Sequence, residues 1–468
     1  MRRSVTLAVA AALAAACSSV YVASTASAAV ACAPAWSASV AYVKDNVVSR
    51  GGNNYTAKWW TQGEDPVAKS GQWDVWINNG ACGGAGTPSP TTTQSQSPTT
   101  PSTGPTTPST GPTTPSTGPT TPLPVGGLPR HALIGYLHAS FANGSGYLRM
   151  ADVPAEWDII NLAFGEPTSA TSGDIRFTLC PATECPGVET EAEFIAAIRA
   201  KRAAGRKVLL SIGGANGQVQ LTTTAARDRF VSSVSAIIDR YGLDGVDIDF
   251  EGHSLSLNTG DTDFKNPTTP VIVNLISAIR SLKARYGAGF VLTMAPETFF
   301  VQLGYQYYGS GPWGGQDPRA GAYLPVIHAL RNDLTVLHVQ DYNSGSIMGL
   351  DNQYHSMGGA DFHVAMTDML LAGFPVAGNT ANVFPALRED QVAFGAPSSV
   401  SAGNGYVAPT GVQQAVTCLV KGTGCGGYTP RSGANPDFRG LMTWSINWDR
   451  FYGWEFRNSH EPFLNALN

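Results

Sequence analysis

The stretch GLDGVDIDFEG, residues 242–252, places four carboxylates among apolar and glycine residues: Asp244, Asp247, Asp249 and Glu251. Carboxylates are costly in such surroundings unless they are paired or hydrogen-bonded. The pattern predicts a β-strand, in which successive side chains point to opposite faces. Asp247, Asp249 and Glu251 therefore share one face, whereas Asp244 is out of phase and is expected near the start of the strand.

Ionising all three carboxylates on one face is energetically unfavourable, because like charges and desolvation raise the pKa of at least one of them. A carboxylic acid that stays protonated near neutral pH is what general acid catalysis requires. The titrations of the three groups are expected to be coupled, so no single pKa is assigned. The same residues would also suit a site for a hard cation such as Ca²⁺, or a buried structural ion-pair network.

The chain from Leu128 onward alternates strand-like and helix-like patterns. Besides the acidic stretch, apolar strands are predicted at residues 132–139, 157–165, 206–214, 289–297, 334–343, 391–397 and 438–447. Strands separated by helices are usually parallel, and eight of them fit an α/β fold, the (β/α)8 TIM barrel. A doubly wound open sheet is the alternative. In a barrel the acidic face points inward, and Glu251 lies at the C-terminal strand end, where barrel enzymes place their chemistry.

The segment DGVDIDFE, residues 244–251, matches the D-x-x-D-x-D-x-E signature of glycoside hydrolase family 18, the chitinases. Four further segments resemble motifs of that family at barrel-strand ends: LLSIGG (209–214), LTMAPE (292–297), QDYN (340–343) and MTWSINWD (442–449). The resemblance extends over residues 130–468. It favours the catalytic interpretation of the acids over the metal and structural ones.

The resemblance implies roles for four residues. Glu251 is expected to protonate the glycosidic oxygen and then to activate water. Asp249 is expected to accept a hydrogen bond from the acetamido N–H of the substrate, with Asp247 pairing with it and sharing its proton. Tyr342 is expected to donate its hydroxyl to the acetamido oxygen as that oxygen attacks C1. The implied mechanism is retention through an oxazolinium intermediate, with the N-acetyl group of the sugar as nucleophile and without a metal or cofactor.

The same resemblance implies the surroundings of these groups. Trp444 is expected to form the floor beneath the distorted sugar. Ser211 and Tyr136 are expected to support Asp247 from neighbouring strands. The other residues expected to line the cleft are Gln340, Asn343, Met294 and Gly213.

One family feature is missing from the sequence. Some members carry an α+β domain between strands seven and eight, which walls the cleft. Here about 40 residues separate the two predicted strands, and they hold only the helical segment GVQQAVTCLV and a Cys418–Cys425 loop. We therefore expect a shallow, open cleft and endo-type cutting.

Residues 29–82 are predicted to form a separate small, β-rich domain. Five of the ten tryptophans lie between residues 32 and 82, and the segment YTAKWWTQGEDP (55–66) resembles chitin-binding modules of carbohydrate-binding families 5 and 12. A chain this short with so many aromatic residues must expose some of them, and exposed flat rings bind the apolar faces of sugars. Trp59, Trp60 and Tyr55 are the expected binding group, while other rings form the core.

Residues 83–127 contain no charge and include three copies of PTTPSTG. Such a segment cannot bury enough apolar surface to fold, so it is predicted to be a disordered linker. At about 3 Å per residue it could reach roughly 140 Å. It would join the small domain to the catalytic barrel, residues 128–468.

Residues 1–28 resemble an export signal. Arg2 and Arg3 precede an apolar run too short to span a bilayer, and Ala26-Ser27-Ala28 is a small-residue cleavage pattern. A twin-arginine route and a lipoprotein site at Cys17 are weaker alternatives. The remaining six cysteines favour disulfides in a secreted protein. Six cysteines allow 15 pairings, and the sequence does not choose among them, although the nearest-neighbour pairs Cys32–Cys82, Cys180–Cys185 and Cys418–Cys425 each fall inside one apparent structural unit. A zinc site is the competing interpretation.

The formal charge of −5 becomes −7 when the arginines of the signal are removed. A mildly acidic chain without basic runs is not expected to bind nucleic acid. No stretch after the signal is long and apolar enough to predict a membrane helix. The expected function is a secreted, monomeric endo-chitinase acting on chitin and chitooligosaccharides. The alternatives are an endo-β-N-acetylglucosaminidase acting on N-glycans and a non-catalytic chitin-binding lectin.

Overall fold

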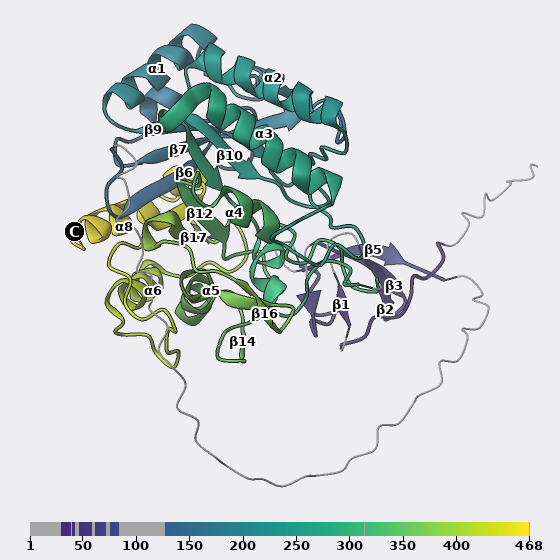
Figure 1. Cartoon of the computed structure of the whole chain (residues 1–468). Coiled ribbons are helices and arrows are strands. Elements are labelled where there is room, and N and C mark those ends of the chain that lie inside the picture. The colour runs from purple at the N-terminus through teal and green to yellow at the C-terminus, as the bar shows by residue number, and fades with distance from the viewer. Residues whose placement is uncertain are drawn as a thin grey trace, which may run out of the picture.

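The computed structural model describes residues 30–38, 40–42, 46–58, 61–71, 75–83, 127–312 and 314–467. Its two folded parts are a closed barrel of parallel strands covered by helices and a small antiparallel module (Figure 1). The predicted export signal and nearly all of the predicted linker lie outside the described residues. Among the described residues, no helix combines the length and apolar character needed to cross a membrane.

The barrel consists of strands β6 (Ala132–His138), β7 (Ile159–Pro167), β9 (Lys207–Gly213), β10 (Gly245–Asp249), β11 (Val291–Met294), β12 (Val336–Gln340), β17 (Val392–Pro397) and β18 (Gly440–Trp444). All neighbouring pairs of these strands are parallel, and the ring closes because β6 pairs with both β18 and β7. The predicted (β/α)8 barrel is confirmed, and the open doubly wound sheet is wrong. Each predicted strand overlaps one barrel strand.

The helices are α1 (Glu191–Ala203), α2 (Thr224–Tyr241), α3 (Pro270–Tyr286), α4 (Leu324–Leu330), α5 (Ala360–Ala372), α6 (Pro409–Lys421), α7 (Ile446–Phe451) and α8 (Glu455–Asn465). Local sequence explains where they begin and end. The hydroxyl of Thr223 accepts a hydrogen bond from the N–H of Ala226 at the start of α2, and Gly242, in the left-handed conformation, ends that helix just before β10. Short strands in the loops are β8 (Ile175–Arg176), β13 (Ile347–Met348), β14 (Tyr354–His355), β15 (Phe374–Val376) and β16 (Asn379–Phe384).

The barrel has an apolar layer on each side of its strands. Val246 and Ile248 of β10 belong to the layer between the strands and the helices. Ile134 and Leu209 belong to the layer inside the ring. Because side chains alternate along each strand, Asp247, which lies between Val246 and Ile248, points into the ring. The parallel register fixes which residues of the neighbouring strands lie beside it.

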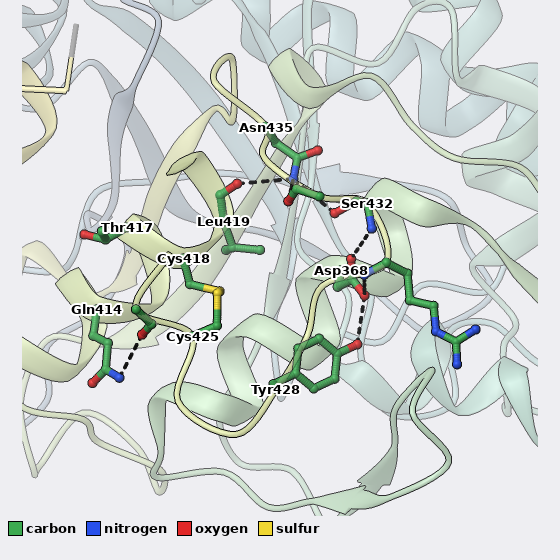
Figure 2. The surroundings of a disulfide bond; sticks show 12 residues. Asp368, Gln414, Thr417, Cys418, Leu419, Cys425, Tyr428, Ser432 and Asn435 are labelled. Carbon is green, nitrogen blue, oxygen red and sulfur yellow. Dashed lines mark hydrogen bonds between the residues drawn. A yellow bond between two sulfur atoms is a disulfide. The ribbon is translucent and has the colours of Figure 1, made fainter. Parts of the chain in front are cut away.

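The connection between β17 and β18 is short, as expected. Residues 398–439, all described, hold α6 and the disulfide loop Cys418–Cys425 and contain no inserted domain. Figure 2 shows Asp368 of α5 beside this loop, where its carboxylate accepts hydrogen bonds from the Tyr428 hydroxyl and the Arg431 N–H, each 2.8 Å long. The segment that follows the disulfide loop is therefore hydrogen-bonded to α5.

The module contains an antiparallel sheet of β2 (Val47–Arg50), β3 (Asn53–Ala57) and β5 (Trp76–Ala81), and a second pair, β1 (Ala41–Tyr42) with β4 (Thr61–Gln62). Its small core packs around fully buried Trp76. The disulfides join the nearest-neighbour pairs Cys180–Cys185, Cys418–Cys425 and Cys32–Cys82, the last across the ends of the module. A covalent closure of this kind compensates for the small core of such a domain.

Candidate active site

Asp247 lies at the centre of a buried hydroxyl network. One of its oxygens accepts hydrogen bonds from Tyr136 and Ser211, both 2.7 Å long, and the other accepts one from Thr293 at 2.6 Å. The donors come from β6, β9 and β11, so three strands converge on one carboxylate. The supporting contacts expected from Tyr136 and Ser211 are present, whereas Thr293 was not anticipated. Three neutral donors stabilise a carboxylate without adding charge.

His338 of β12 is a further neighbour of Asp247 that the sequence did not reveal. Its Nε2 atom lies 3.5 Å from an Asp247 oxygen, and both side chains are fully buried. Burial lowers the pKa of His338, although Asp247 opposes the shift. The imidazole is therefore neutral near neutral pH and adds no positive charge beneath the acids.

Gln340 lies within hydrogen-bond distance of two of the acids, Asp249 and Glu251. Its side-chain amide nitrogen lies 2.9 Å from an Asp249 oxygen, 3.0 Å from a Glu251 oxygen and 2.9 Å from the Ala295 carbonyl. Burial raises the pKa of Asp249 well above its usual range, and the charges of Glu251 and Asp247 add to the effect. The elevated pKa expected for at least one acid thus falls on Asp249. The sharing of its proton with Asp247 stays a prediction.

Tyr342 lies just beyond the end of β12, on the cleft side of Gln340. Its side chain is only 4% exposed, yet it borders the cleft. Burial raises the pKa of Tyr342 well above its usual range, and the charges of Asp249 and Glu251 raise it further. The phenol therefore keeps its proton through the neutral range and can act as a hydrogen-bond donor there.

A cleft of about 370 Å³ opens above these groups at the C-terminal end of the barrel. Eight of the predicted residues line it: Tyr136, Gly213, Asp249, Glu251, Gln340, Tyr342, Asn343 and Trp444. The residues that sequence reasoning missed are Phe141, Phe164, Glu166, Ala215, Asn216, Glu297 and Ala402. The acids thus face a space open to a ligand.

Three aromatic rings in the cleft lie nearly parallel. The Phe164 ring is 5.6 Å from Trp444 with an interplanar angle of 9°, and 6.2 Å from Phe141 with an angle of 6°. The His138 ring packs against two of these rings, because it lies 4.7 Å from both Trp444 and Phe141. Flat rings aligned in this way offer apolar surface to the face of a sugar.

The glycine at the end of β9 is required by backbone packing. Gly213 pairs with Asp249 across the sheet and has a φ of 115°, which disfavours other residues. A Cβ at this position would lie 2.2 Å from the Asp249 carbonyl oxygen. Gly213 of the LLSIGG segment therefore lets the backbone of β9 approach that of β10 closely.

Met294 does not line the cleft, so this prediction is wrong. It is fully buried in the layer between strands and helices, because β11 places it opposite Ile248, an outward residue of β10. Thr293, its neighbour, pairs with Asp247 and points inward. The sequence alone does not choose between the two faces of this strand, because the choice depends on the register of β11 against β10.

The prediction that Tyr55 belongs to the binding group of the module is also wrong. Its side chain is 2% exposed and packs in the module core with Tyr42 and Trp76, so it does not belong to a surface binding group. The physical reason is the small size of the module, which must use large rings to build a core. The other two predicted binding residues, Trp59 and Trp60, lie outside the described residues.

The arrangement suits acid-assisted cleavage of a bond in a neutral, ring-shaped substrate. Glu251 faces the cleft, Asp249 is held beside it, and Tyr342 supplies a neutral donor. General acid–base catalysis by a positioned carboxyl group typically contributes about 10²–10⁴-fold. The aromatic floor would position the substrate over these groups.

Comparison with known proteins agrees with this site. Residues 132–318 match the model of glycosyl hydrolases family 18, and residues 35–76 match carbohydrate-binding module family 5/12. The chain is 75% identical over 337 residues to Exochitinase 1 of Streptomyces olivaceoviridis, covering 72% of this chain but only 56% of that relative. It is 68% identical over 318 residues to a probable class II chitinase of Arthroderma benhamiae, covering 68% of this chain and 95% of that relative.

Solved structures show the same likeness. A family 18 chitinase from Chromobacterium violaceum superposes with a TM-score of 0.64 and 36% identity, over 93% of this chain and all of that one. A putative chitinase A from Streptomyces coelicolor gives a TM-score of 0.60 and 34% identity, over 72% of this chain and 99% of that one. The likeness to the first structure covers nearly all of both chains.

Proposed function

This chain belongs to family 18 of the glycosyl hydrolases, and we propose that it is a secreted chitinase that hydrolyses β-1,4 linkages between N-acetylglucosamine units. The observation that carries the proposal is the row of acids along and just beyond β10, where hydrogen-bonded Asp247, buried Asp249 with its raised pKa and cleft-lining Glu251 follow one another. Relatives with long matches to the chain are named as chitinases.

In the proposed mechanism Glu251 protonates the leaving oxygen. Asp249 orients the acetamido group, whose oxygen attacks C1 while Tyr342 donates a hydrogen bond to it. The oxazolinium intermediate is then opened by water, which Glu251 deprotonates. The support is geometric, because Gln340 holds Asp249 beside Glu251 and burial keeps Tyr342 protonated. Net retention at C1 is the expected outcome.

The remaining parts of the chain have roles in delivery. Residues 1–28 serve as the export signal, residues 29–82 hold the enzyme on solid chitin, and residues 83–127 tether the module to the barrel, residues 128–468. Tethering raises the local concentration of the enzyme without changing its chemistry. Three disulfides fit an oxidising destination outside the cell.

A direct test compares substrates. The full chain should release sugars from colloidal chitin and chitooligosaccharides, and the first product formed should keep the β configuration when anomers are resolved at early times. A glycoprotein carrying N-glycans should remain intact. Release of whole N-glycans without chitin cleavage would instead identify an endo-β-N-acetylglucosaminidase. Binding to chitin without any hydrolysis would identify a lectin.

Endo-type cutting is the proposed mode, because residues 398–439 add no domain that would wall the cleft. Exo-type cutting is a second candidate, since the 75% identical relative is named Exochitinase 1. The two modes differ in how fast polymer length falls relative to the sugar ends formed. A rapid fall in viscosity of a soluble chitin derivative supports endo action, whereas steady disaccharide release at nearly constant viscosity supports exo action.

A further inference from the structure

Three aromatic side chains gather where α7 ends, immediately after the cleft strand β18. The Phe451 ring lies 5.5 Å from that of Trp448 and 5.3 Å from that of Tyr452. Phe451 is 58% exposed and Tyr452 40% exposed, whereas Trp448 is half-buried. Large rings left exposed in a cluster usually mark a binding surface. We call Trp448, Phe451 and Tyr452 the α7 ring cluster.

The α7 ring cluster is joined to one wall of the cleft. Trp448 packs against Gly144, where an added Cβ would lie 3.3 Å from the indole, and Arg450 donates a hydrogen bond to the Ser145 carbonyl at 3.2 Å. Both Gly144 and Ser145 belong to the loop that follows β6. The same loop carries Phe141, which lines the cleft.

A second wall of the cleft also reaches the cluster. The Tyr452 hydroxyl lies 2.6 Å from the hydroxyl of Ser401. Ser401 precedes Ala402, which lines the cleft. The cluster is therefore continuous with the cleft through two loops, and α7 itself begins two residues after the cleft residue Trp444.

The size of the cleft explains why such a surface would be useful. Its volume of about 370 Å³ is near the lower end of the usual range for small-molecule pockets. A polymer of sugar rings cannot fit inside it and must continue across the neighbouring surface. An uncharged saccharide has apolar ring faces and polar edges, which match exposed aromatic rings flanked by hydroxyl groups.

We propose that the α7 ring cluster is an additional binding site for the saccharide chain, lying outside the cleft and contacting sugar units remote from the bond that is cut. The inference rests on the proposed function and deepens it, because it assigns a surface to the longer substrates. Binding there contributes only when the substrate is long enough to reach from the acids to Phe451 and Tyr452.

The test uses the full chain and two soluble substrates, the hexasaccharide and the trisaccharide of N-acetylglucosamine. Replacing both Phe451 and Tyr452 by Ala should lower kcat/KM for the hexasaccharide about tenfold, equivalent to about 1.4 kcal/mol. The value for the trisaccharide should stay within about twofold of wild type. Because both side chains are exposed, the melting temperature should not change.

Two further variants isolate the rings. Tyr452→Phe removes the contact with Ser401 but keeps the ring, so its loss on the hexasaccharide should be smaller than that of the double Ala variant. Val273→Ala removes a 41% exposed apolar side chain on α3, remote from the cluster, and should cleave both substrates as the wild type does. Equal losses on both substrates, or no loss on either, would overturn the site. A wild type that cleaves neither saccharide would reject the proposed function itself, and this inference with it.

Discussion

The barrel and the described part of the N-terminal module differ in where they place aromatic side chains, because the barrel buries many rings and also leaves several at its cleft. In the module, Tyr55 and Trp76 are buried at 2% and 0% exposure and build the core. In the barrel, Trp444, Phe141 and Phe164 line an open cleft. Both parts have sequences that suggest chitin binding, but an aromatic residue can build the core, as Tyr55 does, or face the ligand space, as Trp444 does.

Domain size accounts for the difference. A small domain buries a smaller share of its surface, so its few large rings are needed for stability. The barrel already has two apolar layers, one inside the ring and one beneath the helices, and can leave rings at the cleft. Aromatic content by itself therefore does not identify a binding surface. The comparison predicts that chemistry belongs to the barrel and targeting belongs to the module.

The largest expected effect tests the chemical half of this division. Glu251→Gln keeps the size of the side chain and removes the acid, so turnover should fall by about 10²–10⁴-fold or more on soluble oligosaccharides and on solid chitin alike. Adsorption to chitin should be unchanged because the module is intact. Initial rates on both substrates and a pull-down on chitin measure these quantities. An active variant would return the acids of β10 to a structural or metal-binding role.

A somewhat smaller loss is expected for Tyr342→Phe. This change removes one donor to the developing charge, and removal of such a donor typically costs about 10²–10³-fold in kcat. The fold and much of the binding should survive, since the ring remains in place. Steady-state kinetics with separate kcat and KM values check this, and unchanged kcat would remove Tyr342 from the mechanism.

Two separate variants, Thr293→Val and Met294→Leu, test which face of β11 points toward the active site. Thr293→Val removes a buried hydroxyl bound to Asp247 and should destabilise the fold by about 1–3 kcal/mol while lowering turnover. Met294→Leu nearly conserves volume on the outward face and should cost less than about 1.5 kcal/mol with turnover retained. Denaturant unfolding and kinetics measure both. The reverse ranking in turnover would contradict the inward position of Thr293.

The smallest effect on catalysis is expected for substitutions in the N-terminal module. Replacing Trp59 and Trp60 together by Ala should weaken adsorption to solid chitin, by about tenfold if each ring contributes about 0.5–1 kcal/mol. Hydrolysis of soluble oligosaccharides should be unaffected. Adsorption isotherms and oligosaccharide kinetics on the same protein distinguish the two. An equal loss on both substrates would break the division of labour between module and barrel.

Much of the barrel could be predicted from the sequence, because its signals are local. Apolar runs separated by helical patterns located each of the eight barrel strands, though not the short strands in the loops. The period of two placed Asp247, Asp249 and Glu251 on one face without knowledge of their neighbours. The even number of cysteines indicated disulfides, but the choice of the three pairs among 15 possible pairings came from the structure. Gly213 was expected at the cleft from the family resemblance, whereas its close approach to the carbonyl of Asp249 was not predicted.

The choice between Thr293 and Met294 needed tertiary structure, since it depends on the register of β11 against β10. The burial of Tyr55 depends on how the module packs, and His338 reaches Asp247 only because the ring of strands closes. The α7 ring cluster adjoins the cleft residues Phe141 and Ala402 because the loops after β6 and β17 contact α7 and Tyr452. The sequence by itself determined the strands, the acids and the face they share, as these follow from neighbouring residues. Only the tertiary structure decided which distant side chains surround them, because contacts between strands and loops depend on how the whole chain closes in space.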